Sequence, residues 1–303
     1  MTERIGFDKL SGSGNDFICI DGRDGRLDAV TSSPERLARF ARALCHRGLG
    51  VGADGVILAA KPNDPQEADL GARFLEPDGS EAELCGNGSA CITRWAVDNG
   101  WVKGREVRLQ TPSGVARGRA TAEGYVRVCI PEPHDLATDI EVVAEGVSWR
   151  MDFAITGVPH AVVYVDDVSK VDVARWGRAI RRHDRFAPRG VNVNFTQVLG
   201  VGELAVRTFE FGVEGETLAC GTGSSTAALM AALRFKWPSD YTCQGEPVRV
   251  HVHSGDVLKA FFLIEEDGTV SKACLETVVR CLYTGSLHPE LAERALGKRG
   301  KTG

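Results

Sequence analysis

The stretches Cys85-Gly86-Asn87-Gly88 and Cys220-Gly221-Thr222-Gly223 repeat each other in opposite halves of a 303-residue chain. Each precedes a run with helical character, SACITRWAV after the first and SSTAALMAAL after the second. The repeat indicates a duplicated fold in which each half contributes one cysteine at the start of a helix. Two cysteines in matched settings favour a reaction that needs two opposed acid/base groups.

A second pair of segments supports the duplication. Residues 11–21 (SGSGNDFICID) and 155–167 (ITGVPHAVVYVDD) both run from a glycine-containing turn through an apolar strand to an aspartate. Residues 32–45 and 169–183 predict one further helix per half, each opened by a capping serine. Each half of the chain has a length typical of a protein domain.

Short alternating strands dominate the remainder of each half. Many strands with one central helix per half predict an α/β (α+β) fold of two pseudo-symmetric domains, each a curved mixed or antiparallel sheet around a central helix. The pattern disfavours a parallel βαβ succession. We expect domains at residues 1–133 and 134–275, a strand at 276–290 that can return to the first domain, and a tail at 291–303.

Composition excludes several classes of protein. A net charge of −5 and the lack of a basic run argue against a nucleic-acid surface. No stretch approaches the roughly 18 apolar residues of a membrane span, and the N-terminus lacks the apolar core of a signal peptide. We therefore expect a cytoplasmic protein with reduced cysteines. The sequence contains no CxxC pair, so no structural zinc site is expected. His251-Val252-His253 could supply metal ligands, but alternation of side chains along a strand is the favoured interpretation.

The two glycine-flanked cysteines have a distinctive chemistry. At a helix N-terminus, unpaired N–H groups and the helix dipole favour a thiolate and lower a cysteine pKa from about 8.5 to roughly 3.5–7.5. The same N–H groups can hold a substrate carboxylate, a role that we assign to Gly86, Asn87, Gly221 and Thr222. The alternative, two capped turns with buried inert cysteines, stays open. The remaining cysteines are expected in the core: Cys19, Cys45, Cys91, Cys129, Cys243, Cys274 and Cys281.

Six ordered motifs carry a family resemblance. They are GSGNDF (12–17), RGLGVGADG (47–55), PDGSEAELCGNG (77–88), VPH (158–160), GVNVNFTQV (190–198) and GETLACGTG (215–223). With them the chain resembles the diaminopimelate epimerases, amino-acid epimerases that use no cofactor. The resemblance implies two similar domains with the active site between them, a small amino-acid substrate, a role in lysine biosynthesis and a homodimer.

The resemblance also implies roles for particular residues. Cys85 and Cys220 match the two acid/base thiols, one removing the α-proton as thiolate and the other delivering a proton to the opposite face. His160 and Glu210 match positions that assist these thiols. A buried turn histidine and a plain edge carboxylate are the alternatives for these two side chains.

Substrate recognition is only partly matched. Asn15 matches an amide near the reacting carbon, and Asn192 matches one at the distal end of the substrate. Four positions depart from the family pattern: Glu76 and Val158 where asparagine is usual, Phe211 where arginine is usual, and Gly55 where glutamine is common. The changes at Glu76 and Phe211 replace partners of a distal carboxylate with an acidic and an apolar group.

These departures leave the substrate open. One hypothesis is a racemase of a basic or aromatic amino acid such as lysine, ornithine or histidine, which suits Glu76 and Phe211. The other is a divergent diaminopimelate epimerase with a repositioned arginine, for which Arg73, Arg94 and Arg207 are candidates. A proline racemase-type enzyme and a non-catalytic amino-acid-binding protein are the further alternatives.

Overall fold

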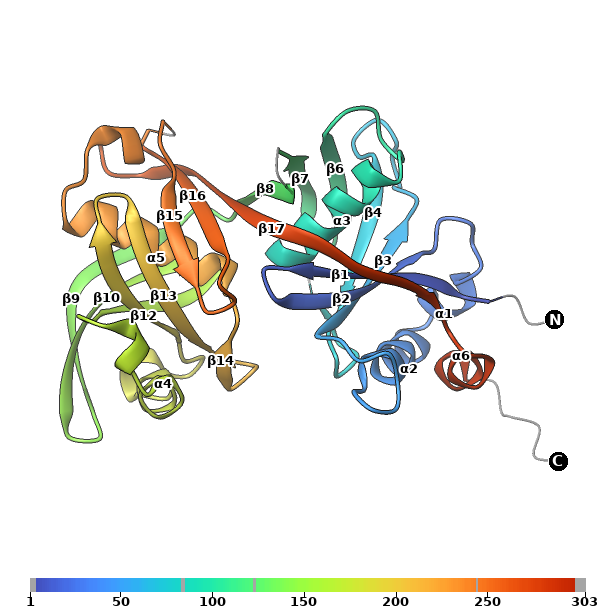
Figure 1. The fold of residues 1–303 in the computed structure, drawn as a ribbon, viewed down its shortest axis with the longest axis horizontal. Helices are drawn as coiled ribbons and strands as arrows, with labels where there is room; N and C mark the ends of the chain where they lie inside the picture. Colours follow the sequence, from blue (N-terminus) through green and yellow to red (C-terminus); the bar gives the residue numbers. More distant parts are fainter. Residues whose placement is uncertain (1–3, 83–84, 122–123, 244, 298–303) are drawn as a thin grey trace. The chain divides into compact units, whose positions relative to one another are not determined.

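The computed structural model describes residues 4–82, 85–121, 124–243 and 245–297, in two compact units (Figure 1). The first unit comprises Met1–Val128 together with Val279–Gly303, and the second is the continuous segment Cys129–Val278. The chain therefore passes from one unit to the other twice, once in each direction. None of the helices in the described residues has the length and apolar character needed to cross a membrane.

The first unit is a mixed sheet with helices. Its strands are β1 (Gly6–Gly12), β2 (Asn15–Asp21), β3 (Gly55–Ala60), β4 (Leu70–Leu75), β5 (Glu81–Ala82), β6 (Glu106–Thr111), β7 (Gly114–Ala120), β8 (Tyr125–Ile130) and the second half of β17 (Val270–Ser286). Its helices are α1 (Asp28–Thr31), α2 (Pro34–Cys45), α3 (Gly86–Asp98) and α6 (Pro289–Leu296). Helix α3 packs against β1, β2, β6 and β7.

The second unit has the same plan. Its strands are β9 (His134–Ala144), β10 (Val147–Thr156), β11 (Val158–Tyr164), β12 (Asn192–Gly200), β13 (Glu203–Glu210), β14 (Gly215–Thr217), β15 (Val248–Val252), β16 (Val257–Ile264) and the first half of β17. Its α-helices are α4 (Val173–Arg181) and α5 (Gly221–Arg234), and short 3-10 turns lie at Val168–Lys170, Asp184–Phe186 and Ser239–Tyr241. Helix α5 packs against β10, β11, β12, β15 and β16.

Strand pairing reproduces the duplication seen in the sequence. In the first unit, β1–β2 is antiparallel, β2–β3 parallel, β3–β4 antiparallel and β4–β6 parallel. In the second unit, β10–β11, β11–β12, β12–β13 and β13–β15 follow in the same order and with the same directions. The predicted fold class, two similar units each with a mixed sheet on a central helix, is confirmed.

The two central helices are buried on nearly all sides, which explains their small residues. In α5 every residue from Gly223 to Ala232 is buried, and most of them are alanine, serine or threonine. Strand β7 approaches α3 so closely that a Cβ on Gly118 would lie 2.0 Å from Oγ1 of Thr93. Small side chains thus let each helix lie directly on its sheet.

One outer helix begins where it was predicted, and the other does not. Helix α2 begins at Pro34 because the Ser33 side chain accepts a hydrogen bond from the N–H of Arg36. The predicted cap of the next outer helix, Ser169, is wrong. That residue lies in a 3-10 turn, and α4 begins four positions later because Asp172 caps it.

The cysteines correct two expectations. Cys129 and Cys274 are joined in a disulfide within the second unit, so the expectation that all nine are reduced is wrong. Cys243 and Cys281 are exposed rather than in the core. Cys19, Cys45 and Cys91 are buried as predicted.

Candidate active site

Both glycine-flanked cysteines cap a helix with their own sulfur atoms. Cys85 precedes α3, and its Sγ accepts the N–H of Gly88 at 3.3 Å. Cys220 precedes α5, and its Sγ accepts the N–H of Gly223 at the same distance. Both cysteines have extended backbone angles, as N-cap residues do. The sequence repeat is therefore a repeat of local geometry.

The second glycine of each motif is required by packing. A Cβ on Gly88 would lie 2.7 Å from the ring of Phe74, and one on Gly223 would lie 2.2 Å from Oδ1 of Asn194. Contacts this short do not occur between real atoms, so a larger residue would displace the first helical turn. By contrast, a Cβ on Gly86 would meet nothing within 4 Å. The start of α3 thus has open space at its first residue.

The surroundings of Cys220 keep it protonated. Burial raises the pKa of this thiol well above its ordinary value, and the nearby charge of Glu210 raises it further. Hydrogen bonds from the N–H of Gly223 and from Thr222 act in the opposite direction but are the weaker influence. For this cysteine the predicted lowering of the pKa by the helix N-terminus is wrong, because desolvation outweighs the helix end.

Glu210 lies at the end of β13 beside the Cys220 thiol. Its carboxylate hydrogen-bonds the thiol and also accepts a hydrogen bond from the hydroxyl group of Thr217 on β14. A carboxylate that accepts the S–H proton stabilises the thiol over the thiolate. Glu210 is therefore placed to hold the proton of Cys220.

His160 reaches Cys220 through an intervening hydroxyl group. The ring is fully buried, and desolvation lowers its pKa to about 3, so the imidazole is neutral. Nε2 lies 3.0 Å from Oγ1 of Thr222, and that oxygen lies 3.7 Å from Sγ of Cys220. Nδ1 lies 3.3 Å from the amide nitrogen of Asn194. Since that amide nitrogen can only donate, Nδ1 accepts and Nε2 carries the proton.

Asn194 orients this chain of hydrogen bonds. Its Nδ2 also donates to the carbonyl oxygen of Ala161 at 2.9 Å, and its Oδ1 accepts from the hydroxyl group of Thr208 at 3.0 Å. Sequence reasoning missed this residue. The signal was present in the alternation Asn192-Val193-Asn194, which puts both amides on one face of β12.

In the first unit, two amides lie next to the start of α3. The Asn87 side chain donates to Oδ1 of Asn15 at 3.4 Å, and Asn15 donates to Oδ2 of Asp54 at 3.1 Å. Arg47 pairs with Asp54 at 2.9 Å. These bonds fix the orientation of the Asn15 amide beside the first turn of α3.

Glu76 lies in an acidic part of the first unit. The residue as a whole is exposed, but partial burial of its carboxyl group raises its pKa, and the charges of Asp78 and Asp54 raise it further. Val158, the other position where asparagine is usual, begins β11 and is half-buried.

Phe211 lies against two guanidinium groups. Its N–H donates to Oδ1 of the buried Asn192 at 2.9 Å. Its ring has the Cζ atom of Arg181 at 5.4 Å and that of Arg189 at 5.7 Å from the centroid. Phe211 therefore stands where arginine is usual, and two other arginines lie over its ring.

Residues 7–130 and 153–274 match the family model described as diaminopimelate epimerase. The chain belongs to this family. The diaminopimelate epimerase of Aquifex aeolicus is 42% identical over 294 residues, covering 95% of this chain and 99% of that protein. That of Chlorobaculum tepidum is 35% identical, covering 92% and 99%. The predicted family is confirmed, and with it the enzyme class, an isomerase.

Solved structures show a wider distribution of the fold. A Bacillus anthracis phenazine biosynthesis protein of the PhzF family has a TM-score of 0.72 at 14% identity, covering 95% of this chain and all of that one. A probable proline racemase from Agrobacterium radiobacter has a TM-score of 0.67 at 17% identity, covering 94% and 93%. At such identities the likeness shows the fold alone.

The three arginines considered as substitutes for the diaminopimelate epimerase arginine are engaged elsewhere. Arg73 pairs with Glu81 at 2.6 Å, Arg94 with Asp98 at 2.7 Å, and Arg207 with Glu216 at 2.6 Å. His251 and His253 contact carboxylates too, at 2.8 and 2.6 Å. The described residues contain no cluster of three or more metal-ligating side chains.

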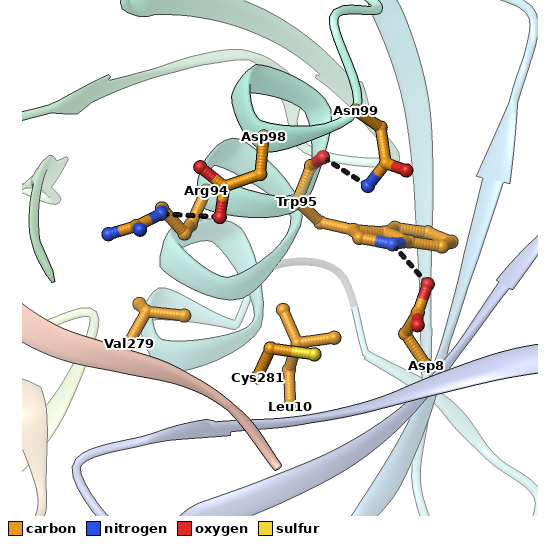
Figure 2. A pocket seen from close by; sticks show the side chains of 8 residues that line it. All are labelled: Asp8, Leu10, Arg94, Trp95, Asp98, Asn99, Val279 and Cys281. Atoms are coloured by element: carbon orange, nitrogen blue, oxygen red, sulfur yellow. Dashed lines mark hydrogen bonds and ion pairs between the residues drawn. The ribbon is translucent and has the colours of Figure 1, made fainter. Parts of the chain in front are cut away.

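A small cavity in the first unit includes Arg94 in its lining. Figure 2 shows its lining, which comprises Asp8, Leu10, Arg94, Trp95, Asp98, Asn99, Val279 and Cys281. Its polar groups bind one another: Nε1 of Trp95 donates to Asp8 at 2.7 Å, and Arg94 donates to Asp98 (Figure 2). None of the sequence-predicted site residues lines it.

Proposed function

We propose that this protein inverts one α-carbon of diaminopimelate, interconverting the LL and meso forms without pyridoxal phosphate, with Cys85 and Cys220 as the two acid/base groups. The observation that carries the proposal is the matched pair of cysteine caps on α3 and α5. The names of the relatives support diaminopimelate as the substrate. A cytoplasmic homodimer belongs to the same proposal.

The raised pKa of Cys220 supports this thiol as the proton donor in one direction of the reaction. The α C–H bond breaks, its proton goes to the Cys85 thiolate, and the electron pair stays on the α-carbon. The S–H bond of Cys220 then breaks, and its proton reaches the opposite face of that carbon. In the reverse reaction Cys220 acts as the base. The hydrogen bond from Thr222 favours its thiolate, and Glu210 stabilises the thiol that forms.

Helix ends supply the stabilisation that a cofactor would otherwise provide. The first-turn N–H groups of α3 and α5 include those of Gly86, Asn87, Gly221 and Thr222, and such groups bind carboxylates. A carboxylate held there draws charge from the adjacent carbanion as it forms. Neutral His160 keeps the Thr222 hydroxyl oriented toward Cys220 without adding a charge.

A racemase of a basic amino acid is the second candidate, and one observation favours it. Glu76 with Asp54 and Asp78 forms an acidic group of side chains, which suits the ammonium end of lysine or ornithine. Diaminopimelate also carries a distal ammonium group. The acidic group alone therefore does not separate the two substrates.

Isotope exchange tests the proposal. Incubation of the purified protein with LL-diaminopimelate in D2O is expected to give meso product and α-deuteration, measured by proton NMR. Cys85→Ser and Cys220→Ser are each expected to lower the rate by at least about 10²-fold, because each removes one acid/base group. Cys243→Ser, an exposed cysteine, is the matched control and should retain the wild-type rate.

The other outcomes select the alternatives. If the protein exchanges the α-proton of lysine or ornithine but not that of diaminopimelate, the second candidate substrate replaces diaminopimelate. If the protein binds an amino acid without exchanging its α-proton, it is a non-catalytic binding protein.

A further inference from the structure

Lys9 is a buried cation in the first unit. It lies on β1 opposite Ile18 of β2, and its exposed fraction is only 3%. Its ammonium group donates to Oδ2 of Asp16 at 2.7 Å and to the carbonyl oxygen of Gly52. A lysine is almost never buried to this extent unless its charge is paired. Since a buried ion pair adds little net stability over an apolar pair of similar volume, what the pair holds in place is the informative property.

Asp16 connects this charge to the loop that precedes β3. Burial acts to raise the pKa of Asp16, but the hydrogen bond and the charge of Lys9, together with the N–H of Asp54, outweigh burial and lower the pKa. The ionised Asp16 accepts the N–H of Asp54 through Oδ1 at 2.9 Å. In return, Oδ2 of Asp54 accepts the N–H of Asp16 at 3.1 Å. Each aspartate therefore holds the backbone of the other.

Asp54 links this pair to the start of α3. Its Oδ2 also accepts a hydrogen bond from Nδ2 of Asn15 at 3.1 Å, and Oδ1 of Asn15 accepts one from Asn87 at 3.4 Å. An ionised carboxylate can only accept, so it selects the nitrogen end of the Asn15 amide and excludes the flipped orientation. Asn87 lies in the first turn of α3, two positions after Cys85. The Asn15 amide is thus held in one orientation beside the helix that Cys85 caps.

The contact of Lys9 with Gly52 holds the same loop from a second side. The N–H of Gly52 donates to the carbonyl oxygen of Leu44 at 2.9 Å, so the loop folds back on the last turn of α2. Gly52 has φ of 80°, which glycine adopts without strain. Because its carbonyl oxygen accepts from Lys9, the backbone is fixed two residues before Asp54.

We propose that Lys9 is a positioning residue of the proton-transfer site: its buried ammonium group, acting through Asp16, holds the Asn15 amide in the orientation that serves the reacting carbon. Lys9 is too deeply buried to touch a substrate, so it acts only through its neighbours. The inference rests on the proposed function. It adds to that function a residue that lies outside all six sequence motifs.

Lys9→Met tests the role of the charge, because methionine keeps an apolar stem but has no ammonium group. The variant is expected to lower kcat for α-proton exchange of diaminopimelate by roughly 10- to 100-fold, since a misplacement of about 1 Å at a reacting centre has an effect of this order. Proton NMR in D2O measures the rate per folded protein. KM should change much less, because the helix ends that bind the carboxylate are retained.

Arg234→Met is the matched control. Arg234 is the last residue of α5 in the second unit, and it pairs at 3.2 Å with Asp152, which is fully buried. Loss of this pair is expected to lower the stability in urea unfolding and to leave kcat at the wild-type value. An equal fall of kcat in both variants would show that the loss of any buried ion pair is sufficient, and it would overturn the inference.

A double-mutant cycle tests whether Lys9 acts through Asn15. In the Asn15→Ala background, Lys9→Met should lower kcat no further, because effects within one hydrogen-bond network are not additive. Losses that multiply would overturn the inference. A crystal structure of Lys9→Met should show the Asn15 amide displaced from Asp54, and an unmoved amide would also overturn the inference.

The remaining outcomes separate the inference from the proposed function. If Lys9→Met does not fold, Lys9→Met/Asp16→Asn replaces it, because that variant leaves neither charge of the pair without its partner. It should show the same loss of kcat, and failure of both variants to fold would assign Lys9 to folding and overturn the inference. A wild-type rate in folded Lys9→Met would overturn the inference and leave the proposed function standing. A wild-type protein that exchanges no α-proton would remove the proposed function and the inference with it.

Discussion

At the scale of single residues, the two cysteines share a cap but differ in their surroundings. Cys220 is buried beside a carboxylate, whereas Cys85 is only half-buried. Burial and the neighbouring carboxylate therefore favour the thiol form of Cys220. The helix end is common to both, so it cannot be the source of the difference.

His160 gives a pH dependence of stability that can be measured. In the unfolded chain a histidine has a pKa of about 6.5, whereas burial lowers that of His160 to about 3. Between these values the unfolded state binds a proton that the folded state does not. The free energy of unfolding should therefore fall by about 1.4 kcal/mol for each unit that the pH drops below 6.5.

Urea unfolding of wild type and His160→Gln at pH 7.5, 6.0 and 5.0 measures this contribution. The variant is expected to be less stable at pH 7.5 but to lose less stability on acidification. His288→Gln, at an exposed histidine, should keep the wild-type dependence. Parallel pH dependences for wild type and His160→Gln would show that the buried ring takes up a proton in the folded state.

Sequence reasoning named residues of the proposed site but not the contacts between them. The cysteine motifs and the family match named Cys220, His160, Glu210 and Thr222. The order in which they touch follows from the register of β11 and β12 and from the start of α5. Pairing register is a tertiary property, so no spacing in one chain could give it.

At the scale of elements, the first turn of α5 depends on a glycine. Gly223→Ala would place a Cβ 2.2 Å from Oδ1 of Asn194 and 3.1 Å from the Cys220 sulfur. We expect a loss of about 1–3 kcal/mol in the free energy of unfolding, as in other overpacked sites. Denaturant unfolding measures it.

The equivalent helix supplies a matched control. Gly86→Ala in α3 meets open space, and alanine favours a helix over glycine by roughly 0.5–1 kcal/mol. This variant should be as stable as wild type or slightly more so. Equal losses in the two variants would contradict the packing argument.

Element boundaries show where sequence patterns were sufficient. Helix α2 and both cysteine helices begin where caps and glycines predicted, because those signals act within one turn. Helix α4 begins later than predicted because Asp172 caps it, whereas Asp167 caps the 3-10 turn that contains Ser169. Arg189 and Phe211 meet through a loop, for which the sequence has no periodic signal.

At the scale of the whole molecule, the disulfide joins the strands at the two passages between units. Cys129 lies on β8 at the start of the second unit, and Cys274 lies on β17 near its end. The bond closes a separation of 145 residues, and loops of this length lose considerable entropy on closure. Replacing both cysteines with alanine should lower the free energy of unfolding by about 2–5 kcal/mol.

Unfolding with and without reductant measures this contribution. Reductant should destabilise the wild type and leave the double variant unchanged, while Cys243→Ala behaves as wild type. Mass spectrometry after alkylation of the unreduced, denatured protein checks the bond directly. Nine alkylated thiols would show that the pair is reduced in solution.

The pairing of β1 with β17 determines the order in which the two units can fold during synthesis. Asp8 on β1 bonds Thr284 on β17 across 276 positions of chain, and Phe7 lies opposite Gly285. Translation therefore delivers the closing strand of the first unit only after Cys129–Val278, the continuous segment that forms the second unit. We expect the second unit to fold before the first, which reverses the usual N-terminal-first order. Until β17 is synthesised, one edge of β1 has no partner strand and is prone to aggregation.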